Sequence, residues 1–199
     1  MGNDSSTATP SFEIKDGNKK IMFSAPHCVE QTRDGRIKSA EGKTGELVRL
    51  LNAEADCPVI YKTENRDDDA NYDSVSPYKD ALCEYVKAHG ITMLVDLHEL
   101  SPARRTLVDV GTGRGKNIKE GEITEFFRNS FCKYPKNSVK IDLPFAGANP
   151  RTVSSHIAAE CGISCIQLEI NCKLLYPSFK EYDFDGILNS LKTIAERFG

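Results

Sequence analysis

Four residues of the sequence have types and positions that could form a hydrolytic metal site. His27 and Glu30 stand three residues apart, just after the apolar run at residues 21–23. His98 follows a second apolar run, and Glu169 interrupts a third. A hydrolytic zinc site needs three protein ligands and one open position for water. His27, Glu30 and His98 are therefore the predicted ligands, and Glu169 is left as a carboxylate that could act as general base.

Each of these residues also has an ordinary structural interpretation. A histidine at the end of a strand more often makes simple hydrogen bonds than it binds a metal. Glu169 is harder to explain in this way, because an ionised carboxylate in a buried strand is costly unless a cation or hydrogen-bond donors satisfy it. Glu46, in the first predicted helix, is a second candidate for the carboxylate ligand. The occurrence of all these groups at one end of a predicted sheet favours the metal site.

The elements that must position these residues alternate between strands and helices. Apolar runs predict strands at residues 21–24, 58–62, 91–97, 106–110, 139–143 and 163–170. A helical apolar period predicts helices at residues 42–55, 77–88, 122–132, 152–161 and 184–198. The pattern predicts a single three-layer α/β domain over residues 11–199 with a central mixed, largely parallel sheet, after a flexible stretch at residues 1–10. Ligands of such sheets lie beyond the carboxyl ends of the strands.

Composition narrows the class of protein. A chain of 199 residues with 39% hydrophobic and 28% charged residues can bury one sizeable core. The net charge of -3, with both signs interspersed, argues against a nucleic-acid partner. No apolar run approaches the ~20 residues of a membrane span, and the first ten residues lack the pattern of a secretory signal. The seven cysteines are never spaced C-x-x-C, which predicts reduced thiols in a cytoplasmic protein.

Five segments in chain order carry a family resemblance. "SAPHCVE", "ENRDDDAN", "VDLHEL", "LVDVGTGRG" and "IQLEIN" resemble motifs of the N-formylglutamate amidohydrolase family and its zinc carboxypeptidase-like relatives. The resemblance implies a three-layer α/β fold and one zinc ion held by two histidines and a carboxylate. It places His27, Glu30 and His98 at the metal and Glu169 as the base. The implied reaction is hydrolysis of an amide bond in a small substrate that carries a carboxylate, such as an N-acyl amino acid.

The resemblance also implies residues of the substrate pocket. It places Arg66, Asp69 and Asn71 of "ENRDDDAN" there, and an arginine offers two parallel donors for a substrate carboxylate. Arg104 follows the His98 strand and Arg151 begins the helix before the Glu169 strand, so both are further candidates. The remaining arginines near the predicted site are Arg33, Arg36 and Arg105.

Alternative functions are also consistent with the sequence. Cys28 and Val29 follow His27, where formylglutamate enzymes usually have small residues, so a carboxypeptidase-type peptidase remains an alternative. A ligand-binding protein that kept the fold and lost the chemistry is another. "GTGRGKN" resembles a phosphate loop but lacks the required Ser or Thr after the lysine. A glycine-rich turn beside the site is the better interpretation of that segment.

Overall fold

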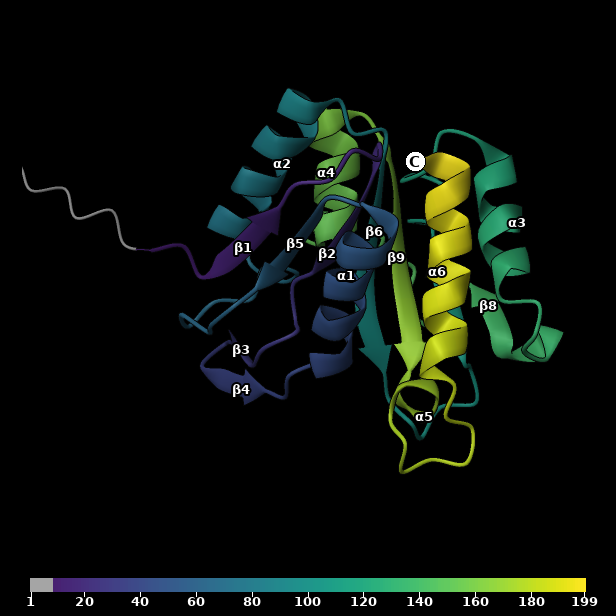
Figure 1. Cartoon of the computed structure of the whole chain (residues 1–199). Coiled ribbons are helices and arrows are strands. Elements are labelled where there is room, and N and C mark those ends of the chain that lie inside the picture. Colours follow the sequence, from purple (N-terminus) through teal and green to yellow (C-terminus); the bar gives the residue numbers. More distant parts are fainter. Residues whose placement is uncertain (1–8) are drawn as a thin grey trace, which may run out of the picture.

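The computed structural model describes residues 9–199, and a seven-stranded sheet forms its centre (Figure 1). The strands of this sheet are β1 (Phe12–Lys15), β2 (Ile21–Ala25), β5 (Val59–Lys62), β6 (Met93–Leu100), β7 (Val108–Gly111), β8 (Val139–Ile141) and β9 (Ser164–Asn171). Their order is β1-β5-β2-β6-β9-β7-β8. The four central strands are parallel, whereas β1 and β7 run antiparallel to β5 and β9. The predicted mixed, largely parallel sheet is confirmed; the flexible stretch predicted at residues 1–10 lies almost wholly outside the described residues.

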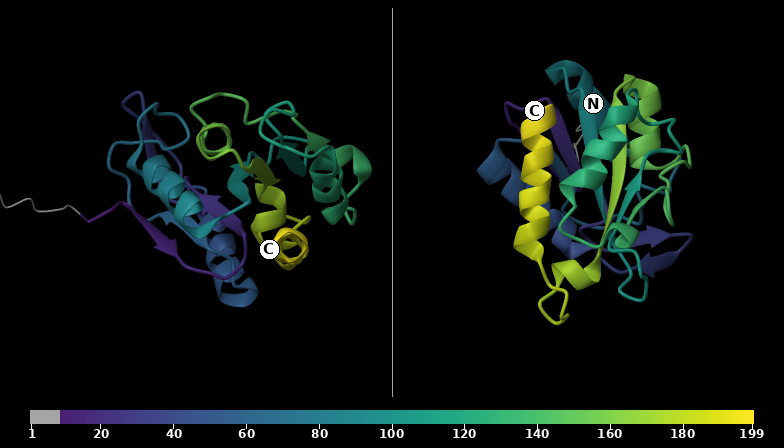
Figure 2. Two further views of the ribbon diagram at one scale, coloured as in Figure 1. Left: turned by 90° about the horizontal axis from the view of Figure 1, so that it is seen from above. Right: turned by 90° about the vertical axis from the view of Figure 1, so that its right-hand side faces the viewer.

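Helices cover both faces of the sheet and complete a three-layer α/β domain (Figures 1 and 2). The helices on one face are α1 (Gly42–Ala55), α3 (Gly121–Ser130) and α6 (Phe184–Phe198). Those on the other face are α2 (Pro77–His89) and α4 (Val153–Cys161), which pack against each other. A short helix, α5 (Cys172–Leu175), follows β9, and a 3-10 turn covers Lys136–Ser138. Within residues 9–199, no helix is long and apolar enough to cross a membrane.

The alternation of side chains along β6 decides which face carries the polar groups. Val95 and Leu97 pack into the core beneath α1 and α6. Leu94 packs into the second core, beneath α2 and α4. Because successive side chains of a strand point to opposite faces, Asp96 and His98 lie on the same face as Leu94, toward the carboxyl end of the strand.

Strand β9 repeats this arrangement beside β6. Cys165 packs with α2 and α4, and Gln167 and Glu169 follow on the same face by the period of two. The parallel register pairs Asp96 with Gln167 and His98 with Glu169. The polar side chains of two neighbouring strands therefore meet near the carboxyl ends of both.

A small antiparallel hairpin, β3 (Gln31–Arg33) and β4 (Arg36–Lys38), interrupts the chain between β2 and α1. Asp34 and Gly35 form its turn with φ values of 51° and 71°. Two-residue turns of this kind require positive φ at both positions, which Asp-Gly adopts readily. This hairpin was not among the predicted strands, and it determines which carboxylate comes near the histidines.

Candidate functional site

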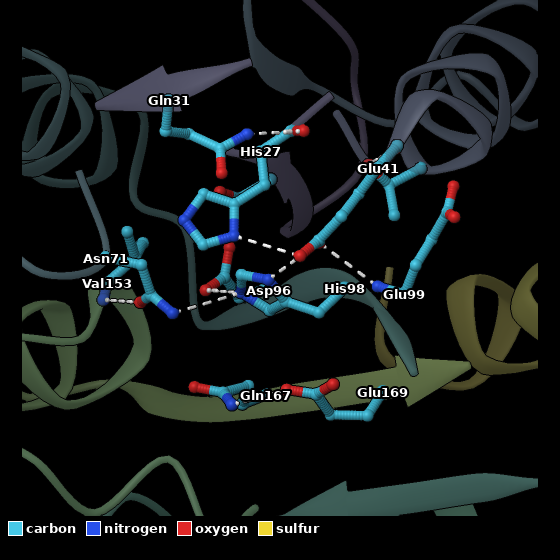
Figure 3. Close-up of polar contacts among 12 residues, drawn as sticks. His27, Gln31, Glu41, Asn71, Asp96, His98, Glu99, Val153, Gln167 and Glu169 are labelled. Atoms are coloured by element: carbon cyan, nitrogen blue, oxygen red, sulfur yellow. Dashed lines mark hydrogen bonds and ion pairs between the residues drawn. The ribbon is translucent and has the colours of Figure 1, made fainter. Parts of the chain in front are cut away.

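Two histidines and one glutamate form a tight cluster at the carboxyl ends of β2 and β6 (Figure 3). His27 Nδ1 lies 3.2 Å from Glu41 Oε1, and His98 Nδ1 lies 3.1 Å from Glu41 Oε2. One ring nitrogen of each histidine and one carboxylate oxygen of Glu41 lie within 4.8 Å of one another. The two Nδ1 atoms therefore face a shared carboxylate.

A buried aspartate stands behind each imidazole. His27 Nε2 donates to Asp69 Oδ1 at 2.8 Å, and His98 Nε2 donates to Asp96 Oδ2 at 3.0 Å. Both aspartate side chains are inaccessible to solvent. Such carboxylates fix the ring orientation and direct the opposite nitrogen toward a metal. Arg33 donates to the second oxygen of Asp69 at 2.9 Å, which holds this aspartate in place.

The charges of this cluster shift the pKa values of its members. Burial lowers the pKa of His27 and His98, but the neighbouring carboxylates outweigh burial and raise both above the ordinary value. For Glu41, burial raises the pKa, and the two histidines outweigh it and hold the carboxyl well below its usual range. The shifts of the two imidazoles and of the carboxyl group thus have opposite directions, because each charge stabilises the other.

Glu30 does not join the histidines, contrary to the expectation from the His-x-x-Glu spacing. Its side chain is exposed, because Glu30 leads directly into the β3–β4 hairpin, which carries the chain away from the site. After the hairpin the chain returns at Glu41, whose N–H donates to the carbonyl of His27 at 2.8 Å. Glu46, the other carboxylate considered, pairs with Lys43 on the surface of α1 and is 44% exposed.

Glu169 lies on β9, next to the cluster and with its side chain toward the same pocket (Figure 3). It is buried, and burial together with the charges of Glu41 and Asp109 raises its pKa to about 7, against the opposing effects of His98 and a hydrogen bond. That bond comes from Gln167 Nε2, 2.9 Å from Glu169 Oε1. A carboxyl group with a pKa near neutrality can both accept and release a proton.

A pocket of about 660 Å³ opens over these residues and is rimmed by basic side chains. The basic residues that line it are Arg33, Lys38, Arg104 and Arg114. The hairpin provides the first two of these. Arg114 comes from the "GTGRG" segment after β7, where Gly113, Arg114 and Gly115 all have positive φ. The predicted glycine-rich turn beside the site is therefore present.

Two of the five residues predicted for the substrate pocket line it, and three do not. Asn71 lines the pocket, with Nδ2 3.4 Å from His98 Nε2, and Arg104 lies at the rim. Asp69 is buried behind His27 and does not line the pocket. Arg66 is 42% exposed and pairs with Glu64 on the outer surface, and Arg151 is exposed and stacks beside Tyr72. Neither Arg66 nor Arg151 lines the pocket.

One sequence signal could have identified Glu41. Asp34-Gly35 is a strong short-range signal for a hairpin. A hairpin over residues 31–38 removes Glu30 from the site and brings the chain back just before α1. The carboxylate at that return point is Glu41.

The fold of this chain is shared with solved hydrolase structures. The chain has the three-layer α/β fold found in solved N-formylglutamate amidohydrolase and metallo-carboxypeptidase structures, as the motif resemblance predicts. The sequence itself matches no family model, and no curated protein is significantly similar to it.

Three solved structures illustrate the likeness. An N-formylglutamate amidohydrolase from Ralstonia eutropha JMP134 superposes with a TM-score of 0.68 at 15% identity, over 94% of this chain and 98% of that one. A metallo-carboxypeptidase from Burkholderia cenocepacia gives 0.57 at 14% identity, over 96% and 67% of the two chains. A bacteriophage poly-gamma-glutamate hydrolase gives 0.55 at 12% identity, over 96% and 92%. At these identities the likeness defines the fold, and the chemistry must be argued from the residues.

Proposed function

We propose that the protein is a zinc-dependent hydrolase that cleaves an amide bond in a small substrate carrying a carboxylate, such as an N-acyl amino acid. The observation that carries the proposal is the cluster of His27, Glu41 and His98 beside the buried carboxyl group of Glu169. The names of the similar structures, an amidohydrolase among them, agree with this chemistry.

The donor set of the cluster fits a zinc ion. Two imidazole nitrogens and one carboxylate oxygen are typical of hydrolytic zinc sites, which keep a further position open. Asp69 and Asp96 back the two imidazoles in the manner usual for metal-binding histidines. A zinc ion, when bound there, acts as a Lewis acid and lowers the pKa of a water molecule to about 7. We therefore assign His27, Glu41 and His98 as the ligands, with Glu41 in place of Glu30.

Glu169 is the proposed general base. Its carboxylate takes a proton from the attacking water and returns it to the nitrogen that leaves. Burial raises the pKa of this carboxyl group, which favours its holding the proton before release, and a bound cation offsets part of that rise. Gln167 holds one carboxylate oxygen by its amide, so the carboxylate keeps its orientation through the reaction.

Arg33 is the proposed anchor for the substrate carboxylate. Asp69 binds its Nε and Nη2 at 2.9 and 2.7 Å, and its guanidinium stacks on the ring of Tyr72 at 4.6 Å. These contacts fix the plane of the guanidinium, and the side chain still lines the pocket. A fixed guanidinium plane suits bidentate binding of a carboxylate. Arg104 and Arg114 lie at the rim as additional positive charges.

The test combines metal analysis with a substrate panel on one preparation. We expect about one zinc per chain and turnover of N-acyl amino acids, with N-formyl, N-acetyl and N-succinyl derivatives compared. Faster turnover of peptides with a free carboxyl terminus would instead indicate a peptidase. Stoichiometric zinc with no turnover of any amide would indicate a binding protein, and absence of zinc would contradict the proposal.

A further inference from the structure

The first turn of α1 lacks the side-chain cap that its own N-cap residue would normally provide. Glu41 occupies the N-cap position, and its side chain makes no hydrogen bond to the helix. Both of its carboxylate oxygens instead face His27 and His98. The first N–H groups of a helix have no partner within the helix. Another group must therefore bind the donors that Glu41 leaves free.

Glu99, the residue after His98 in β6, provides this group. Its Oε1 accepts from the backbone N–H of Lys43, in the first turn of α1, at 2.8 Å. A carboxylate suits this position because the helix N-terminus carries partial positive charge. Tyr176 Oη donates to the same carboxylate at 3.0 Å, and Cys172 Sγ donates to it at 3.4 Å.

The main chain of Glu99 makes a second contact with the same region. Its N–H donates to Glu41 Oε2 at 3.1 Å (Figure 3). The N–H of Glu41 in turn donates to the carbonyl of His27. The side chain of Glu99 thus holds the helix, and its main chain holds the carboxylate that the helix presents.

We propose that Glu99 caps α1 in place of Glu41 and thereby positions the Glu41 carboxylate between the two imidazoles. Glu99 borders the same pocket, but it is a positioning residue and not a ligand: it is outside the cluster of His27, Glu41 and His98. Its carboxylate is bound by the N–H of Lys43, by Tyr176 and by Cys172. The consequence for metal affinity rests on the proposed zinc site. The positioning itself can be measured without metal.

The first experiment measures zinc affinity by competition with a chelator. Glu99→Leu should weaken zinc binding by about tenfold or more, the usual size of effects from groups behind the ligands. Glu99→Gln should restore most of the affinity, because its amide oxygen can still accept from Lys43. The matched control is Glu46→Gln, which alters a carboxylate in the same helix without touching Glu41 and should leave affinity unchanged. Equal zinc affinity in Glu99→Leu and the parent would overturn the inference.

The second experiment uses the metal-free protein and separates this inference from the proposed function. Glu99→Leu should speed amide hydrogen exchange at Lys43 and shift the ring-nitrogen resonances of His27 and His98. Faster exchange with unchanged ring resonances would mean that Glu99 is only a helix cap, which contradicts the inference. A parent protein that binds no zinc would contradict the proposed function, and this readout would still decide the role of Glu99.

A milder variant covers the case in which Glu99→Leu does not fold. Tyr176→Phe removes the hydroxyl group that orients Glu99 and leaves the ring in place. It should shift the same histidine resonances in the same direction by a smaller amount. Unchanged resonances in a folded Tyr176→Phe protein would count against the positioning of Glu41 through Glu99.

Discussion

Two buried aspartates decide which nitrogen of each imidazole is available to a metal. Because Asp69 and Asp96 bind the Nε2 atoms, both Nδ1 atoms turn toward Glu41. Asp96 has fewer contacts than Asp69. Among the described residues its Oδ1 has no hydrogen-bond partner, and its Oδ2 accepts only from His98. Replacing Asp96 should therefore affect mainly His98.

Asp96→Asn is expected to weaken zinc binding without removing the site. An amide oxygen still accepts from His98 Nε2, but it lacks the charge that makes the imidazole a stronger ligand. We expect a loss of about 10–100-fold in zinc affinity, measured by chelator competition. Asp185→Asn, on the exposed side of α6, is the matched control and should bind zinc like the parent. An unchanged affinity in Asp96→Asn would show that the aspartate only fills space.

Glu169→Gln keeps the size and shape of the side chain but removes its ability to accept a proton. The variant should lose about 10²–10⁴-fold in kcat and keep its zinc. In the parent, kcat/KM should fall as pH drops, because protonated Glu169 cannot accept a proton. Its pKa is about 7 without metal, and a bound cation lowers this value, so the acidic limb should lie at or below pH 7. Activity near the parent level would exclude Glu169 as base, and loss of zinc would make it a ligand.

Arg33→Lys keeps the charge at the pocket but removes the guanidinium plane. We expect kcat/KM to fall by about one to two orders of magnitude. If Arg33 binds the substrate and the transition state equally strongly, most of the change will be a higher KM. Arg66→Lys is the matched control, because Arg66 lies outside the pocket. A larger effect at Arg66 than at Arg33 would support the motif resemblance over the geometry.

The residues of the site were predictable where they stand on regular strands. His98 and Glu169 follow from the period of two and from the rule that strand ends meet at one edge of a sheet. The carboxylate of the cluster was not predictable from local spacing, because the hairpin places Glu41 beside His27 and turns Glu30 outward. Arg66 follows from the motif resemblance alone, and an arginine on a loop has no periodicity that shows which way its side chain points.

Two loops form one wall of the pocket, and a buried lysine of α2 joins them. Lys79 Nζ donates to the carbonyls of Asp73 and Arg151 at 2.7 and 2.8 Å and is 1% exposed. Asn71 Oδ1 accepts from the N–H of Val153 at 2.7 Å and adds a second bond between the same loops. The loop that carries Asp69 and Asn71 is therefore tied to the N-terminus of α4.

Lys79→Met should lower stability through the two carbonyls left unpaired. Methionine keeps the apolar stem, so the change removes mainly the ammonium group. A buried group without its partner costs about 1–3 kcal/mol, and for a chain of this size each kcal/mol lowers the melting temperature by about 2–4 °C. Calorimetry of Lys79→Met and of Lys87→Met, an exposed lysine on the same helix, makes the comparison. Equal melting temperatures would mean that the loops are held without Lys79.

The sequence predicted the long helices more accurately than the short strands. The predicted bounds of α1 and α6 agree with the structure because both helices show a sustained apolar period. The four-residue strand β1 and the three-residue strands β3 and β4 were not predicted. Strands β5, β7 and β8 are equally short and were predicted, because apolar residues mark them. Strands β1, β3 and β4 consist mainly of polar residues that are not fully buried, so they show no apolar run.

The proposed metal joins segments that are far apart in the chain, so its removal should affect the whole molecule. Zinc that binds only the folded state adds to its stability by mass action, about 2.7 kcal/mol at a hundred times the dissociation constant. We expect a chelator to lower the melting temperature and added zinc to restore it. His98→Ala should melt at one temperature with or without zinc. A zinc-dependent increase that persists in His98→Ala would contradict the ligand assignment.

The position of β9 has a consequence for the order of folding. β6 is bounded by β2 on one side and by β9 on the other, and β9 lies late in the chain. A chain emerging from the ribosome thus exposes the assigned ligands before it can complete the sheet around them. Because parallel strands that are distant in sequence pair slowly, we expect refolding chains to acquire Glu169 beside the histidines only in the final cooperative step. Catalytic competence would then appear later than helix formation, with the same time constant as burial of β6.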